Sequence, residues 1–397
     1  MDKLQIALIF LGGFVLSRAL VRTRVPERLV FLLLGRRHNG LSTVIGILAL
    51  AAALLSLFIP NLITVLTLLP VLELLRRAFA DRDHPGAVTP LTLAVIYGAN
   101  IGGMGSVTGT PSNLLFLGYV TATRTPGMEQ VGFASWLAWG VPLVLLSVAA
   151  AWCVLVLGFR TWGGHLPQVH LPVGPEQACH PLQRQVVILG GLYLVTAFVL
   201  SWLQAAHPEG GAAWTAVTAL FTLALVGWLY LWPQPGGERI LRWRDSYTGL
   251  PLRGFGLLAL VGLLAGLFYA LHLQDWLSAR AAAWLPREGG AWMPLALALV
   301  TSFSTEVLSN SLVQVGLFLV IDSLGTALGV SPLSAMLIVT LSCTCAFMSP
   351  IATGVNALAF GGVRGVSLLR MLAVGALMNG VMAALVAWYV PAWVPWG

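Results

Sequence analysis

Apolar stretches alternate with short polar connections along the whole chain. Several stretches approach the roughly 20 residues that a helix needs to cross a bilayer, and others are clearly shorter. They lie at residues 4–21, 41–59, 61–75, 88–99, 135–158, 185–205, 214–232, 255–273, 291–303, 311–328, 333–348 and 368–390. This pattern predicts an all-α, polytopic membrane protein rather than a soluble one.

The composition agrees with a membrane protein. Of the 397 residues, 58% are hydrophobic and only 9% are charged, whereas soluble domains carry about 25% charged residues. The four cysteines and seven histidines show no metal-binding spacing, so we expect no cofactor other than coupling ions.

Positive charge is concentrated in a few connections, including residues 22–37, 76–82 and 239–253, which are expected to be loops. With these loops on one side of the membrane, all but four of the 21 Lys and Arg residues lie there. This asymmetry predicts an inner-membrane protein with cytoplasmic basic loops and an outside C-terminus. The topology therefore accounts for the net charge of +7 without a nucleic-acid partner. The first apolar stretch lacks a small-residue cleavage site and is expected to remain as a span.

Two glycine-rich, polar stretches interrupt the apolar pattern. The first is "ANIGGMGSVTGTPSNLLF" at residues 99–116, and the second is "CTCAFMSPIATGVNALAF" at residues 343–360. Thr110 and Thr353 occupy the same place in them, 243 residues apart. Glycine and proline at these places are expected to break a membrane helix midway. Such breaks hold cations on freed carbonyls and anions on half-helix N-termini.

An asparagine lies upstream of each stretch, at the turn between two short apolar runs. Asn61 and Asn310 are separated by 249 residues, and "LGGFVLSRAL" at 11–20 matches "VGLLAGLFYAL" at 261–271 near the same offset. Three features recurring in order predict an internal duplication. Short arms with a polar tip indicate re-entrant hairpins. An odd number of crossings between the copies predicts inverted repeats, the architecture of secondary transporters.

The duplication predicts two repeats joined by a cytoplasmic linker at residues 161–184. The first repeat, residues 1–160, is expected to contain a short scaffold part, a hairpin at 41–75, a broken helix at 88–121 and a helix at 135–158. The second, residues 185–397, is expected to contain scaffold helices at 185–273, a hairpin at 291–328, a broken helix at 333–361 and a helix at 368–390.

The first stretch allows other interpretations. The spacing of Gly105 and Gly109 is also typical of helix packing in membranes. A phosphate-binding loop is excluded, because "GGMGSVTG" lacks the Gly-Lys-Ser/Thr ending and lies at membrane depth. Glu306, the acidic residue near a hairpin tip, either orients the hairpin backbone or carries protons.

At these residues the chain resembles the divalent anion/sodium symporter (DASS) family of the ion-transporter superfamily. "STEVLSNS" at residues 304–311 is similar to the family hairpin motif T-E-x-x-S-N-T. "CAFMSPIATGVNALAFG" at 345–361 resembles the signature S-x-A-F-M-x-P-x-A-T-P-P-N-A-x-x-F-G, and the first stretch resembles the version ending G-T-P-P-N. The similarity runs in order over essentially the whole chain.

The resemblance implies an elevator-type transporter, usually a homodimer, that couples sodium to a small anion such as a di- or tricarboxylate or sulfate. By matching position it implies a first sodium site at Ser56, Pro60, Asn61 and Gly109, and a second at Thr305, Leu308, Asn310 and Ala352. It implies substrate contacts from Asn61, Thr110, Pro111, Asn310, Ser311 and Thr353. A dianion buried without Lys or Arg needs bound cations, because an unpaired charge is very costly at low dielectric.

The chain departs from the family pattern in three places. Pro60 and Leu62 flank Asn61 where the family has hydroxyl residues, and each lost donor is worth about 0.5–1.5 kcal/mol net. Gly354 and Val355 replace the second Pro-Pro pair. Scaffold helices that the family places before the first apolar stretch have no counterpart, through either a late start codon or a reduced scaffold.

Alternative functions stay open from the sequence. One is a proton-coupled permease or an oxyanion or arsenite-type exporter of the same superfamily. Another is a non-transporting membrane sensor derived from the fold, although no soluble signalling domain is recognisable. An intramembrane enzyme would need a nucleophile with a base, or paired metal-binding carboxylates, and the sequence places only Glu306 at depth.

Overall fold

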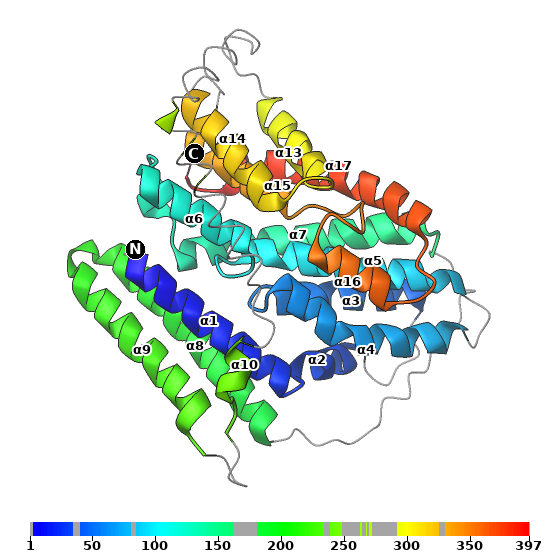
Figure 1. Ribbon diagram of the computed structural model, residues 1–397, viewed down its shortest axis with the longest axis horizontal. Coiled ribbons are helices and arrows are strands. Elements are labelled where there is room, and N and C mark those ends of the chain that lie inside the picture. The colour runs from blue at the N-terminus through cyan, green and yellow to red at the C-terminus, as the bar shows by residue number, and fades with distance from the viewer. Residues whose placement is uncertain are drawn as a thin grey trace.

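The chain is helical throughout the part that the computed structural model describes. That part comprises residues 3–34, 40–80, 85–161, 181–233, 239–247, 263, 267, 270–271, 292–324 and 330–396. Within it, the one strand-like feature is an isolated bridge between Pro233 and Arg239. The all-helical fold class predicted from the apolar pattern is therefore confirmed (Figure 1).

The helices of the first half are α1 (Lys3–Arg22), α2 (Val25–Leu34), α3 (Leu41–Ser56), α4 (Asn61–Ala80), α5 (Val88–Gly102), α6 (Pro111–Thr123) and α7 (Phe133–Gly158). Those of the second half are α8 (Pro181–Ala206), α9 (Gly211–Leu231), α10 (Trp243–Tyr247), α13 (Met293–Ser304), α14 (Asn310–Leu324), α15 (Pro332–Cys343), α16 (Gly354–Gly362) and α17 (Leu368–Trp393). Single 3-10 turns occupy Pro85–Ala87, Gly103–Gly105, Met128–Gln130 and Pro208–Gly210.

Among the described residues, four helices are long and apolar enough to cross a membrane: α7, α8, α9 and α17. Helices α3, α13, α14 and α15 are apolar but shorter. Large apolar side chains on α8 and α9 face outward, with Leu192 55% and Leu220 70% exposed. Such surfaces are stable in lipid rather than in water, and the chain is a multi-pass membrane protein.

The same packing arrangement occurs in both halves of the chain. Helix α3 packs on α5 and α7, as α13 packs on α15 and α17. The second parts of the broken helices are exchanged between the halves, because α6 packs on α14 and α15 while α16 packs on α4 and α5. Helices α7 and α17 pack on each other at the centre. The duplication predicted from the sequence thus recurs in the contacts.

A second group of helices lies beside this bundle. Helices α1, α8 and α9 pack together, and Figure 1 shows α1 in blue alongside the two green helices. Their shared core contains Leu16, Tyr193 and Leu229, and the Tyr193 hydroxyl donates to the Ile9 carbonyl at 2.6 Å. This group joins the larger bundle mainly where α8 packs on α7.

One expectation is wrong, and two others lie mostly beyond the described part. Residues 22–37 were expected to form a loop, but the segment Val25–Leu34 is helix α2, which packs on α3 and α4. Leu29 of α2 packs against the main apolar core, and Pro26 is tolerated because it lies in the first helical turn. The predicted linker at 161–184 and the predicted scaffold helix at 255–273 fall largely outside the described residues.

Candidate ion and substrate site

The first hairpin tip is closed by its own polar side chains. Helix α3 ends at Ser56 and α4 begins at Asn61, and the Ser56 hydroxyl donates to Asn61 Oδ1 at 2.7 Å. The Pro60 carbonyl accepts from the amides of Ile63 and Thr64 at 2.9 and 3.0 Å. Three of the four residues predicted for the first sodium site therefore lie together at one turn.

The first broken helix separates between α5 and α6. Thr110 has an extended backbone (φ −137°, ψ 154°) and caps α6, where its hydroxyl accepts from the Asn113 amide at 3.3 Å. The Asn113 side chain donates to the carbonyls of Gly103 and Ser106 at 2.8 and 2.7 Å. One buried amide therefore satisfies two carbonyls that the break removes from the helix.

Glycine is required where this break folds back on itself. A Cβ on Gly109 would overlap the Gly103 carbonyl oxygen. A Cβ on Gly103 would overlap Thr110 Cγ2 and lie 2.6 Å from Asn61 Oδ1. Gly103 and Gly109 thus let the hairpin tip, the break and the start of α6 meet. Gly105 has a different role, because a Cβ there would overlap Leu57 Cδ2 and come 2.8 Å from Val144.

The second broken helix repeats this geometry between α15 and α16. Thr353 is again extended (φ −139°, ψ 158°), and its hydroxyl accepts from the Asn356 amide at 3.1 Å. The Asn356 side chain donates to the carbonyls of Ala346 and Ser349 at 2.9 and 2.8 Å. Each of these residues lies 243 positions after its counterpart in the first break, so the sequence alignment holds at the level of individual hydrogen bonds.

The second hairpin tip is more open than the first. Helix α13 ends at Ser304 and α14 begins at Asn310. The Thr305 hydroxyl donates to the Ser302 carbonyl at 2.9 Å, and the Leu308 amide donates to the Ser304 carbonyl at 2.9 Å. Val307 at this tip is 81% exposed. Of the residues predicted for the second sodium site, Ala352 lies at the neighbouring break, where its amide donates to the Ser349 carbonyl at 3.3 Å.

Glu306 holds the second break to the hairpin and to α17. Its carboxylate is buried and accepts from the amides of Met348 and Ser349 at 2.9 and 2.7 Å. It also accepts from the Asn379 side chain at 2.7 Å. A carboxylate with three donors in place serves as an anchor for the backbone, which favours the orienting role over the proton-carrying one.

The first half has an apolar version of the same anchor. Leu57 stands 249 residues before Glu306, and Val144 occupies the place in α7 that Asn379 occupies in α17. There the Ser106 hydroxyl donates to the Leu57 main-chain carbonyl. Both long helices approach a break at a glycine: a Cβ on Gly140 would lie 2.7 Å from the Gly105 carbonyl oxygen.

Each hairpin also reaches the broken helix of the other half. Leu62, just past the first tip, lies 3.6 Å from where a Cβ on Gly354 would stand. Gln314 in α14 donates to the Ser112 carbonyl at 2.9 Å, at the start of α6 beside Pro111. Ser311 occupies the first turn of α14. The first hairpin thus lies near the start of α16 and the second hairpin near the start of α6, an arrangement that we call the crossing.

The sequence analysis assigned no role to the side chains of four amide residues in this region: Asn100, Gln314, Asn356 and Asn379. All four are at most 2% exposed. Each is an amide within an apolar helix, and that is the one signal that could have identified them. An unpaired amide in such a place is costly, so its presence indicates a partner.

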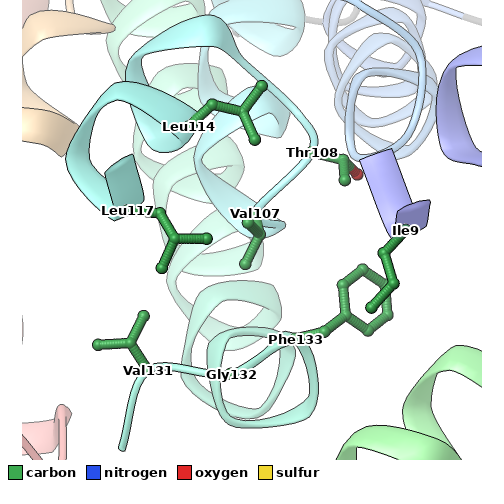
Figure 2. Close-up of a pocket in the computed structure, with 8 residues that line it drawn as sticks. All are labelled: Ile9, Val107, Thr108, Leu114, Leu117, Val131, Gly132 and Phe133. Atoms are coloured by element: carbon green, nitrogen blue, oxygen red, sulfur yellow. The ribbon is translucent and has the colours of Figure 1, made fainter. Parts of the chain in front are cut away.

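A separate cavity lies between α1 and the first break (Figure 2). Ile9, Val107, Thr108 and Phe133 line it with other mostly apolar side chains, and about 10 Å³ is accessible to water, room for roughly one molecule. All of the predicted site residues belong to the described part of the chain, and none of them lines this cavity. Gly13 of α1 faces Thr108 beside this cavity.

Comparisons with known proteins agree with this architecture. A family model described as "Citrate transporter" matches residues 3–227, more than half of the 397 residues. A sodium-dependent dicarboxylate transporter SdcS from Staphylococcus saprophyticus is 26% identical over 94% of this chain and 74% of its own length. The SdcS protein of Staphylococcus aureus strain USA300 is 27% identical over 97% of this chain and 76% of its own length.

Among solved structures, the YdaH transporter of Alcanivorax borkumensis superposes with a TM-score of 0.61. The identity is 13%, over 99% of this chain and 86% of that chain, so this likeness concerns the fold. Together with the sequence matches, it confirms the resemblance to the divalent anion/sodium symporters and shows a transporter rather than an enzyme. The chain belongs to the citrate transporter family.

Proposed function

We propose that this protein is a sodium-coupled transporter of a di- or tricarboxylate that works by an elevator mechanism. The observation that carries the proposal is the meeting of the Ser56–Asn61 tip with the Gly103–Thr110 break. The geometry of the break itself recurs 243 residues later in the other half, at Thr353 and Asn356. Named relatives that are sodium-dependent dicarboxylate transporters support the choice of ion and substrate.

The donor chemistry suits sodium. Hard cations bind oxygen ligands, and carbonyls freed at helix breaks supply them. In the first site we assign Ser56, Pro60, Asn61 and Gly109, and in the second Thr305, Leu308, Asn310 and Ala352. These eight positions contain no carboxylate and no Lys or Arg, so the ligands are neutral oxygens.

The same turns suit a carboxylate. Helices α6 and α16 both begin at the crossing, and the N-terminus of a helix attracts anions through its free amides and its dipole. We assign substrate contacts to Asn61, Thr110, Pro111, Asn310, Ser311 and Thr353. Because none of these groups is cationic, bound sodium has to balance the substrate charge. Sodium therefore binds first and organises the tips, and the anion follows.

The moving unit that we propose contains the two hairpins, the two broken helices, α7 and α17. The unit that stays in the membrane contains α1, α8 and α9, and it is expected to form the interface of a homodimer. The contact of Gly13 with Thr108 and the small apolar cavity beside it lie on the surface between these units. Helix α8 packs on α7 across the same surface, so the proposed movement slides these two helices past each other.

The test is uptake by the full chain in proteoliposomes. Radiolabelled succinate, citrate and sulfate are each offered with an inward sodium gradient, or with choline in place of sodium. We expect succinate or citrate uptake that depends on sodium. Equal uptake in choline would instead support a proton-coupled permease. Ligand-induced thermal stabilisation without any uptake would favour the non-transporting sensor.

A further inference from the structure

Asn100 is an amide in α5, a helix that is buried along its whole length. All fifteen residues of α5 are buried, and Asn100 itself is 2% exposed. A side-chain amide has two donors and an acceptor with two lone pairs, and leaving them unpaired in an apolar interior is costly. Its contacts therefore indicate why an amide stands there.

The Asn100 side chain lies between the two halves of the molecule. On one side its Oδ1 accepts from the Asn61 side chain at 3.4 Å, at the first hairpin tip. On the other side its Nδ2 donates to Asn356 Oδ1 at 3.4 Å and to the Ala346 carbonyl at 3.3 Å, at the second break. One residue thus connects a tip in one half to a break in the other.

The connection continues to groups that we assign to the ions and to the substrate. Ser56 donates to Asn61 Oδ1 at 2.7 Å, and Thr353 donates to Asn356 Oδ1 at 3.0 Å. The hydrogen-bonded series therefore runs from Ser56 through Asn61, Asn100 and Asn356 to Thr353. We call this series the amide bridge. The Asn100 contacts with Asn61 and Asn356, both 3.4 Å, are longer than the usual 2.7–3.2 Å.

The other half lacks the amide of this bridge. The residue 243 positions after Asn100 is Cys343, whose thiol donates to the main-chain carbonyl of Asn310 at 3.5 Å. In the described part of the chain, the side-chain oxygens Asn310 Oδ1 and Asn113 Oδ1 are buried without a hydrogen-bond partner. These two residues are the counterparts of Asn61 and Asn356, which Asn100 connects. The counterparts of Asn61 and Asn356 are therefore present, but no amide residue stands between them at the counterpart of Asn100.

We propose that Asn100 is a positioning residue that couples ion binding at the Asn61 tip to the substrate-binding turn at Thr353. The Asn310 tip has no such tie, so its order depends on the bound ion. This inference rests on the proposed function, because it assigns the ion to one end of the bridge and the anion to the other. Asn100 acts through Asn61 and Asn356 and touches neither ligand.

The experiment exchanges the two equivalent residues in the full chain. Asn100→Cys, Cys343→Asn and the double exchange are reconstituted in proteoliposomes, with Asn100→Gln as the conservative variant. The measurements are the succinate KM, the maximal rate and the sodium concentration for half-maximal uptake, alongside thermal unfolding without sodium. The sodium dependence of KM separates coupling from a structural role, which would lower the unfolding temperature alone.

Asn100→Cys is expected to raise the half-saturating sodium concentration and the succinate KM by about 2- to 13-fold for each hydrogen bond lost, with a smaller change in maximal rate. Asn100→Gln is expected to recover part of the loss. Cys343→Asn is expected to lower the half-saturating sodium concentration, because its amide supplies a donor for the unpartnered oxygens. It also tests the proposal by itself if Asn100→Cys does not fold.

Two results would overturn the inference. One is an unchanged sodium dependence in Asn100→Cys together with a lower unfolding temperature, and the other is an unchanged or higher half-saturating sodium concentration in Cys343→Asn. Both differ from a failure of the proposed function, which would appear as sodium-independent uptake by the unmodified protein.

Discussion

The anchor formed by Glu306 and Asn379 provides a quantitative test of how the second break is held. Replacing Glu306 with Leu recreates the residue at the equivalent position of the first half. It leaves the Met348 and Ser349 amides and the Asn379 side chain without their acceptor. Each buried or partly buried donor left unpaired costs up to about 1–3 kcal/mol, and the desolvation cost of the lost carboxylate returns part of it.

We therefore expect Glu306→Leu to destabilise the protein by about 3–5 kcal/mol, because three hydrogen bonds to a charged group are lost at about 1.5–3 kcal/mol each and the desolvation cost of the carboxylate offsets part of the loss. The double change Glu306→Leu with Asn379→Val mimics the Leu57 and Val144 pair and removes one of the three unpaired donors. It should therefore be about 1–3 kcal/mol less destabilising than the sum of the single changes.

The assay is equilibrium unfolding of the full chain in mixed micelles, arranged as a double-mutant cycle. Glu306→Gln is the matched variant, because it keeps the size but offers a single acceptor. Sodium-dependent succinate uptake at several pH values then distinguishes anchoring from proton carriage. Anchoring predicts that Glu306→Gln lowers the rate at every pH and preserves its pH dependence. Full stability of Glu306→Leu, or a pH dependence abolished in Glu306→Gln, would refute the reasoning.

Four further outcomes are expected. Asn310→Ala should abolish sodium-dependent uptake while thermal unfolding stays near that of the unmodified protein; normal uptake would contradict the site assignment. Gly103→Ala should reduce uptake more than tenfold, because its Cβ would overlap Thr110 and approach Asn61. The matched control Gly118→Ala should transport normally, because the space around its Cβ is open. Ser56→Ala should raise the half-saturating sodium concentration by about 2- to 13-fold, measured by uptake against sodium. Thr353→Ala removes the cap of α16 and should cost about 1 kcal/mol of stability and raise the succinate KM; an unchanged KM would place the substrate elsewhere.

The sequence predicted the fold class, the repeat and the two breaks, because these depend on local patterns. Apolar run length distinguishes spans from hairpin arms, and glycine with proline marks where a helix breaks. Equivalent positions such as Thr110 and Thr353 could be matched since both perform the same capping task. The assignment of ions and substrate to residues, the repeat boundaries, the topology and the dimer stay predictions.

The parts that sequence reasoning missed depend on contacts between distant residues. Asn100 stands 246 residues from Ala346 and 256 from Asn356, and no local pattern specifies such pairings. Helix α2 was expected to be a loop because its flanking arginines dominate the hydropathy of the segment. Its helical form depends on packing against α3 and α4.

The close approach of Gly140 to Gly105, and of Gly375 to Phe347 and Met348, has a consequence for transport. At both places the main chain of a long helix lies directly against the main chain of a break. No side chain lies between them that could change its conformation and let the helix and the break separate. In the proposed elevator mechanism, an ion held at a break would then travel the full distance that α7 or α17 travels. The ion and the helices that hold it would cross the membrane as one rigid body. A disulfide engineered between α7 and the first break should therefore leave uptake intact.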